Sequence, residues 1–131
     1  MSYQSIGLDE LEARPFPGGG GAWKPIRETF GIQSFGINVW VGEEAGKPVI
    51  GEHDESGGRQ HEELYFVTRG HATFTVDGDE VDAPAGTFVY VPTPGVRRKA
   101  VAREAGTTVL ALGGWSGRPF RISAWERRWT G

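Results

Sequence analysis

The chain has 131 residues, of which 37% are hydrophobic and 24% are charged, and its formal net charge is −3. This length suits one domain with one hydrophobic core, and this composition excludes a disordered chain. The absence of cysteine excludes disulfides, thiolate metal ligands and a cysteine nucleophile.

Membrane and nucleic-acid partners are not expected. No apolar run approaches the ~20 residues of a membrane-spanning helix, and the N-terminus lacks the basic-then-apolar pattern of a signal peptide. We therefore expect a cytoplasmic protein. Residues 1–96 carry 15 acids and 6 bases, whereas residues 97–131 carry 8 bases and 2 acids. Because no nucleic-acid-binding motif accompanies these bases, we expect acidic neighbours from earlier strands to neutralise them.

Residues 1–33 are predicted to form an arm outside the main domain. Leu8 and Leu11, with the acids around them, suggest a short helical turn that ends before Pro15. The stretch 15–21 is rich in proline and glycine, which remove backbone donors and raise the entropic cost of ordering. Its glycine run lacks the lysine and the serine or threonine of a phosphate-binding loop. We therefore predict a flexible arm.

Short strands separated by turns are predicted to fill residues 34–114. Asp77 and Gly78 suit the two positive-φ positions of a type I′ hairpin turn. About eight short strands with turns between them are typical of a sandwich or barrel, and we predict an all-β, jelly-roll β-barrel with short N- and C-terminal extensions. The expected strands cover 34–41, 47–55, 62–67, 71–76, 79–81, 87–91, 96–102 and 107–112.

The C-terminal extension, residues 115–131, is rich in tryptophan. Ser123 can cap a short helix over residues 124–129, which would place Trp125 and Trp129 on one face. Tryptophan buries a large area, so we expect these rings to pack on the barrel, where they close one end or seal a dimer. A platform for stacking sugar or other rings is the alternative.

The stretch from His61 to Gly95 resembles the cupin family. Glu63 and Gly70 match the second half of the first cupin motif, and Gly86 matches the start of the second. Pro92 and Gly95 match the next positions of this second motif, and one extra residue stands before Gly95 in the proline-rich turn. The resemblance covers roughly residues 36–112 and implies a small single-domain cupin whose metal motifs are degenerate.

Cupins of the usual kind bind a divalent metal through two histidines and a glutamate of the first motif and one histidine of the second. Glu63 stands in its place, but the two preceding histidine positions fall in the stretch 56–59, which has none. An expanded loop would shift the pair to His53 and Glu55, and His61 shares a strand face with Glu63. A site of His53, of Glu55 or His61, and of Glu63 would suit iron(II), manganese or zinc.

Arg98 stands where the second motif has its histidine. Arginine has no lone pair to offer a metal and stays protonated. Its guanidinium can instead pair with the carboxylate of Glu63. The usual four-ligand metal site is therefore not expected.

Two functions stay open. In the first, the barrel binds a small anionic molecule without a catalytic metal, and its predicted binding residues are Arg98, Arg59, Tyr65, Phe74, Phe88 and Tyr90. In the second, a rearranged metal site makes the protein a small metal-dependent enzyme of oxygenase or isomerase type, with the ligands His53, Glu55, His61 and Glu63. Exposed strand edges and the tryptophans favour a homodimer in either case.

Overall fold

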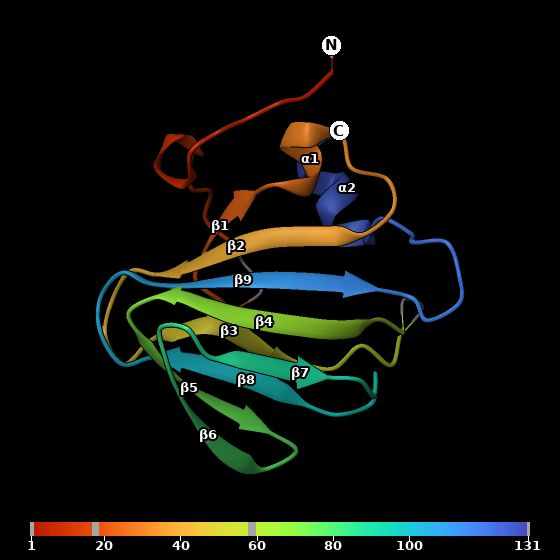
Figure 1. The fold of residues 1–131 in the computed structure, drawn as a ribbon. Coiled ribbons are helices and arrows are strands. Elements are labelled where there is room, and N and C mark those ends of the chain that lie inside the picture. The colour runs from red at the N-terminus through yellow and green to blue at the C-terminus, as the bar shows by residue number, and fades with distance from the viewer. Residues whose placement is uncertain (1, 17–18, 58–59, 131) are drawn as a thin grey trace.

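The protein, seen in a computed structural model that describes residues 2–16, 19–57 and 60–130, consists of two antiparallel sheets packed face to face (Figure 1). The five-stranded sheet contains, in spatial order, β1 (Ala22–Pro25), β2 (Gly36–Gly42), β9 (Thr107–Gly114), β4 (Glu62–Arg69) and β7 (Phe88–Val91). The four-stranded sheet contains β3 (Pro48–His53), β8 (Arg98–Ala102), β5 (His71–Val76) and β6 (Asp79–Pro84). The predicted all-β jelly-roll barrel is confirmed.

Three short helical elements lie outside the sheets. They are the 3-10 turn η1 (Leu8–Glu10), α1 (Arg27–Phe30) and α2 (Ala124–Thr130). The C-terminal helix therefore begins directly after Ser123, where its start was predicted, although the side chain of Trp129 lies outside the described residues. Within the described part of the chain, no helix is long and apolar enough to span a membrane.

The hairpin between β5 and β6 has the predicted turn, because both Asp77 (φ 53°) and Gly78 (φ 84°) adopt positive φ. Strand β6 is longer than predicted and reaches Pro84, which pairs with His71. Proline is tolerated there because β6 is an edge strand whose outer side needs no ladder hydrogen bond.

The hydrophobic core lies between the two sheets. Inward-facing residues of both sheets form one buried cluster: Val49, Ile50, Tyr65, Val67, Ala72, Phe74, Ala83, Val89, Val91, Ala100 and Val109. Alternation along each strand sends every second side chain into this layer. The cluster fills the middle of the barrel.

The N-terminal segment differs from the predicted flexible arm. Its strand β1 pairs along its whole length with β2, and Gly21 donates a backbone hydrogen bond to the carbonyl oxygen of Val49 (3.1 Å). A Cβ at Gly21 would lie 2.2 Å from the carbonyl oxygen of Val41, so only glycine allows this approach. The absence of a side chain at Gly21 thus lets the segment dock closely against the barrel. The conformational propensity of glycine, from which a flexible arm was predicted, does not reveal this contact.

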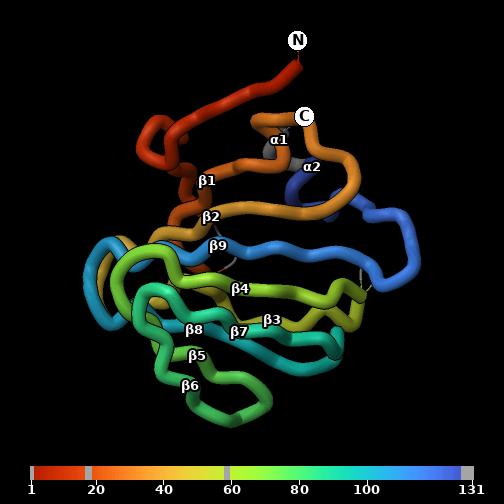
Figure 2. The backbone as a smooth tube through the Cα atoms, viewed as in Figure 1, coloured from red at the N-terminus to blue at the C-terminus, as the bar shows by residue number. Residues whose placement is uncertain are grey.

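The two ends of the chain meet on one side of the barrel. Figures 1 and 2 show the N-terminal segment, α1 and α2 gathered beside β1 and β2, beyond the edge of the five-stranded sheet. Arg27 of α1 and Glu126 of α2 form a buried ion pair there, with Nε and Oε1 2.7 Å apart. Segments 99 positions apart in the sequence are thereby held together.

We expect Gly21→Ala to lower the free energy of unfolding by about 2 kcal/mol, because the new methyl group would overlap backbone atoms that cannot rotate away. Urea unfolding followed by tryptophan fluorescence measures the change. Gly95→Ala is the matched control, since a Cβ at Gly95 meets no atom within 4 Å. Equal stability of the two variants would show that the segment around Gly21 does not dock as described.

Candidate metal centre

The candidate site lies at one end of the barrel, where four strands begin or finish. Strand β3 ends at His53, β8 begins at Arg98, and these two residues are cross-strand partners. In the other sheet, Glu63 near the start of β4 pairs with Gly113 near the end of β9. Strand register therefore brings His53, Arg98 and Glu63 to the same end of the space between the sheets.

The connection between β3 and β4 supplies the remaining groups. The Glu55 N–H donates to the carbonyl oxygen of Pro94 (2.7 Å), and the Gln60 N–H donates to the carbonyl oxygen of Glu55 (2.9 Å). Asp54 accepts two hydrogen bonds from Ser56, which tightens the turn after the strand. These contacts hold the Glu55 carboxylate buried at the barrel end rather than in solvent.

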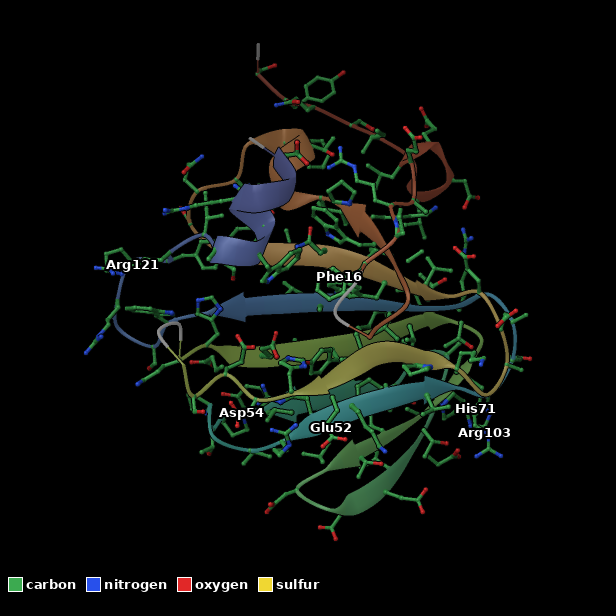
Figure 3. All side chains as sticks on the ribbon, turned by 180° about the vertical axis from the view of Figure 1, so that it is seen from behind. Phe16, Glu52, Asp54, His71, Arg103 and Arg121 are labelled. Atoms are coloured by element: carbon green, nitrogen blue, oxygen red, sulfur yellow. The ribbon has the colours of Figure 1, made fainter. Side chains whose placement is uncertain are left out.

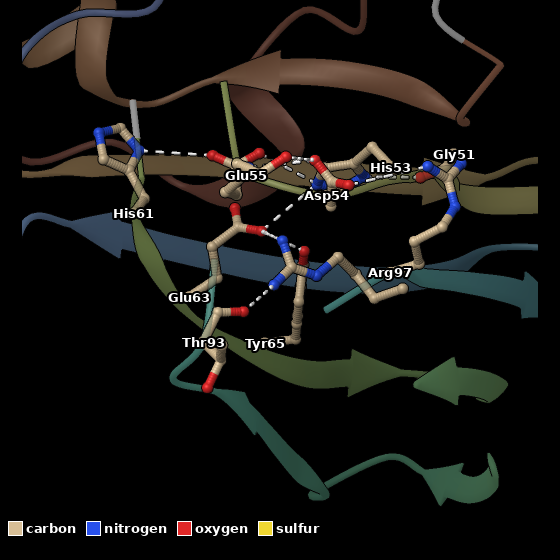
Figure 4. A network of polar contacts seen from close by, with 11 residues as sticks. Gly51, His53, Asp54, Glu55, His61, Glu63, Tyr65, Thr93 and Arg97 are labelled. Atoms are coloured by element: carbon tan, nitrogen blue, oxygen red, sulfur yellow. Dashed lines mark hydrogen bonds and ion pairs between the residues drawn. The ribbon is translucent and has the colours of Figure 1, made fainter. Parts of the chain in front are cut away.

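Two carboxylates converge on one imidazole nitrogen (Figure 4). His53 Nε2 lies 3.4 Å from Glu55 Oε2 and 3.4 Å from Glu63 Oε1. One donor atom from each of these three residues lies within 4.8 Å of the others. His61 stands beside them, with its Nδ1 3.6 Å from Glu55 Oε1.

The orientation of the His53 ring is set by the backbone. Its Nδ1 lies 2.8 Å from the carbonyl oxygen of Gly51, which can only accept, so Nδ1 carries a hydrogen. Nε2 of a neutral ring would then present its lone pair to two carboxylates. Burial lowers the pKa of His53, but Glu63, the Gly51 carbonyl and Glu55 together raise it above its ordinary value. The geometry demands a positive charge at this point, either a proton or a metal ion.

Glu63 is held by three neighbours. Its Oε1 accepts hydrogen bonds from Tyr65 (2.5 Å) and from Arg98 Nη1 (3.2 Å), and it faces His53. Burial raises the pKa of Glu63, but His53, Tyr65 and Arg98 outweigh that effect and hold the pKa below its ordinary value. Burial and the Glu63 carboxylate raise the pKa of Tyr65 well above its ordinary value, so the phenol remains a donor.

The residues present fit a divalent metal ion. Donor atoms bound to one ion at about 2.1 Å lie about 3.0 to 3.4 Å apart, and His53 Nε2 stands 3.4 Å from each carboxylate. The Nδ1 hydrogen bond to Gly51 is the outer contact that metal-binding histidines usually make. A mixed nitrogen and oxygen donor set suits a first-row metal ion. His53, Glu55 and Glu63 could therefore hold one.

A cavity of about 240 Å³ opens above these groups. Its polar lining includes the carboxylates and imidazoles of the candidate centre, and its apolar lining comes largely from β2 and the two terminal segments. The lining residues are Phe16, Gly36, Ile37, Asn38, Trp40, Ile50, Gly51, Glu52, His53, Glu55, His61, Glu63, Tyr65, Ala111, Gly113, Phe120, Ser123, Trp125 and Glu126.

Aromatic rings form the side of the cavity that lies opposite His53, Glu55 and Glu63. Phe16 packs edge-on against Trp40 and Trp125, with ring centroids 4.8 and 5.1 Å apart. Figure 3 shows Phe16 at β2, to one side of α2. On another side, Phe120 lies against His61, with centroids 5.1 Å apart. The terminal segments thus supply much of the enclosure.

The predicted binding residues do not lie together around the cavity as expected. Arg98 is 1% exposed and does not line the cavity, because its guanidinium lies behind Glu63 and also reaches the carbonyl oxygen of Thr93. Tyr65 lines the cavity, whereas Phe74 is buried in the core away from it. Arg59 lies outside the described residues.

The expectation that Phe88 and Tyr90 line the pocket is wrong. They are 64% and 56% exposed, and the valines between and after them point inward instead. Phe88 stacks on Phe66 on the outer face of the sheet, with centroids 4.2 Å apart, and the Tyr90 hydroxyl donates to Glu62. Every residue of β7 is apolar or aromatic, so alternation of polarity could not identify its inner face.

Sequence reasoning missed most of the cavity wall. Phe16 comes from the predicted arm, Trp40 from the predicted strand 34–41, and Phe120 and Glu126 from the predicted C-terminal extension. The density of tryptophan near the C-terminus was the one available signal. His71, the third histidine, bonds to Asp82 toward the opposite end of the barrel from Asp54 and takes no part in the site (Figure 3).

We expect Arg98→Met to lower the free energy of unfolding by about 3 kcal/mol, because it leaves the partly buried Glu63 carboxylate without its buried guanidinium partner. Urea unfolding measures this change, and adding Glu63→Gln should recover more than half of the loss. The adjacent Arg97→Met is the control, since the exposed Arg97–Glu52 pair should be worth less than about 1 kcal/mol. Additive losses in the double variant would refute the coupling.

Known proteins resemble this chain in structure rather than in sequence. No protein-family model matches the sequence, and no curated protein matches it. A cupin protein from Bacteroides fragilis superposes with a TM-score of 0.66 at 17% identity, over 94% of this chain and 92% of that one. The protein KdgF from a Halomonas species superposes with a TM-score of 0.69 at 15% identity, over 86% and 93%.

A third structure carries an activity in its description. It is a sugar phosphate isomerase of the cupin superfamily from Silicibacter pomeroyi, with a TM-score of 0.67 at 21% identity, over 86% of this chain and 76% of that one. Similarity at these identities establishes the fold and no more. The chain is therefore a small single domain with the cupin fold.

Proposed function

We propose that this protein binds one divalent metal ion through His53, Glu55 and Glu63, and that a small anionic molecule binds to this metal inside the cavity. The observation that carries the proposal is the convergence of two carboxylate oxygens on the Nε2 atom of His53 at 3.4 Å each. Three acceptors at such distances repel one another unless a positive charge lies between them. Iron(II), manganese and zinc suit this donor set.

The charge around the site supports an anionic ligand. Among the described residues of the centre, Glu55 and Glu63 contribute two negative charges, and Arg98 behind Glu63 contributes one positive charge. A divalent ion would leave the centre with one net positive charge when His53 is neutral. An anion that coordinates the metal would balance this charge. The ligand would then be an anion, as the sequence predicts, but it would bind to the metal and not to Arg98.

The cavity sets the size of the ligand. Its volume of about 240 Å³ lies below the ~300 to 1,000 Å³ of pockets that take drug-sized molecules. A ligand of a few carbon atoms or a single small ring matches this space. Within the described residues, the lining contains no lysine or arginine, so the metal would be the site's main attraction for an anion.

A metal-dependent enzyme is the second candidate function. Three protein ligands leave positions open on the metal, which is the arrangement of catalytic rather than structural metal sites. A bound metal would polarise a ligand oxygen as a Lewis acid. The Tyr65 hydroxyl, a retained donor on Glu63, would fix the direction of that carboxylate. The cupin fold accommodates an isomerase in one of the similar structures, and this chain would be of isomerase or oxygenase type.

We expect untagged protein to bind close to one transition metal ion per chain, and Glu63→Gln and His53→Ala to lower the content at least tenfold, because each removes one of three ligands. Elemental analysis after dialysis against manganese, iron(II) or zinc measures this content. His71→Ala is the control, because it removes a histidine that lies outside the site.

Retention of full metal content by both ligand variants would contradict the proposed site. A metal content near zero in the wild type and in every variant would favour a protonated His53 as the source of the positive charge. Loss in the two ligand variants but not in His71→Ala is the result that the geometry predicts. The homodimer and the cytoplasmic location stay predictions.

A further inference from the structure

Glu126 is a buried carboxylate in the cavity wall that the metal centre does not use. It lies on α2, is 2% exposed and lines the same cavity as His53, Glu55 and Glu63. Burial raises the pKa of Glu126, partly offset by Arg27. A carboxylate withdrawn from water is costly unless its oxygens accept hydrogen bonds, so both of its oxygens need partners.

Only one of these oxygens has a partner within the described part of the chain. Arg27 Nε donates to Oε1 at 2.7 Å, while Arg27 Nη1 is committed to the carbonyl oxygen of Ile32 at 2.8 Å. Among the described residues, the side-chain hydrogen bonds of Glu126 are confined to Oε1, and Oε2 receives none. Glu126 therefore has an acceptor oxygen left to offer in a cavity whose neighbouring walls are aromatic.

The surroundings of Glu126 indicate what this oxygen would accept. Arg27 and Glu126 form a locally neutral pair, so Oε2 does not require a second cation. The rings of Phe16, Trp40 and Trp125 present no strong hydrogen-bonding group except the tryptophan N–H. A hydroxyl group on the ligand would satisfy Oε2, and an apolar or planar body would suit the rings.

We propose that Glu126 determines ligand specificity by accepting a hydrogen bond from a hydroxyl group on the ligand, at the end away from its metal-bound anionic group. This inference rests on the proposed metal function, since the metal fixes the anionic end. The ligand class is then a small hydroxylated carboxylate or similar anion with an apolar or planar middle. Arg27 acts as a positioning residue, because it holds Glu126 and does not line the cavity.

The variant Glu126→Gln tests this inference directly. The amide oxygen can still accept from Arg27 Nε, while the second position changes from an acceptor to an N–H donor. The probes are 3- and 4-hydroxybenzoate with their methoxy counterparts, which accept but cannot donate. Isothermal titration calorimetry on zinc-loaded protein measures each dissociation constant.

We expect the zinc-loaded wild type to bind at least one hydroxybenzoate about tenfold or more tightly than its methoxy counterpart, because an unmatched buried acceptor is costly. Glu126→Gln should remove or invert this preference. A preference due only to the larger size of the methoxy group would persist in the variant. Glu28→Gln, which alters a neighbouring carboxylate on α1 outside the cavity, should keep the wild-type ratio.

The outcomes separate this inference from the proposed function. Zinc binding with the same hydroxy-to-methoxy ratio in wild type and Glu126→Gln would overturn the specificity role and leave the metal function standing. Absence of any preference in the wild type would overturn it as well. Failure of the wild type to bind zinc before any benzoate is added would overturn the proposed function, and this inference with it. An unchanged melting temperature of Glu126→Gln would show that any altered ratio is not a folding defect.

Discussion

The structure of the site depends on how one buried and one partly buried carboxylate, Glu55 and Glu63, are compensated at one end of the barrel. Glu55 and Glu63 both approach His53 within 3.4 Å, in surroundings where like charges repel strongly. Glu63 is neutralised from behind by Arg98 and directed by the Tyr65 hydroxyl. The carboxylate of Glu55 faces both imidazoles, with Oε2 3.4 Å from His53 Nε2 and Oε1 3.6 Å from His61 Nδ1.

Arg98 stands where the resemblance to cupins would place a metal ligand. Where cupins usually present a fourth metal ligand from the second motif, this chain has a permanent cation that cannot coordinate. Its guanidinium would repel a metal ion at the same point, but it is drawn behind Glu63 and out of the cavity. The turn after His53 is held by the Glu55 N–H bond to Pro94, and it brings the Glu55 carboxylate against His53. Arg98 and Glu55 therefore approach the His53–Glu63 contact from different sides, one with a positive and one with a negative charge.

The barrel could be predicted from the sequence because its signals are local. Alternation along residues 62–67 identified the inner face of β4, and Asp77-Gly78 identified a hairpin from the backbone angles it requires. Strand β1 could not be predicted, because its four residues gain their strand conformation from pairing with β2. The inner face of β7 was likewise hidden, since a strand of only apolar residues has no polar side to mark.

The cavity wall could not be predicted, because segments far apart in the sequence form it together. Phe16 and Trp125 meet only because the two ends of the chain dock beside β2, joined by the Arg27–Glu126 pair across 99 positions of sequence. Strand register fixes the floor of the cavity, whereas the terminal segments supply the opposite wall. The floor can therefore retain one chemistry while the wall changes. A chain with this barrel and different ends would keep His53, Glu55 and Glu63 in place and enclose a cavity of different shape.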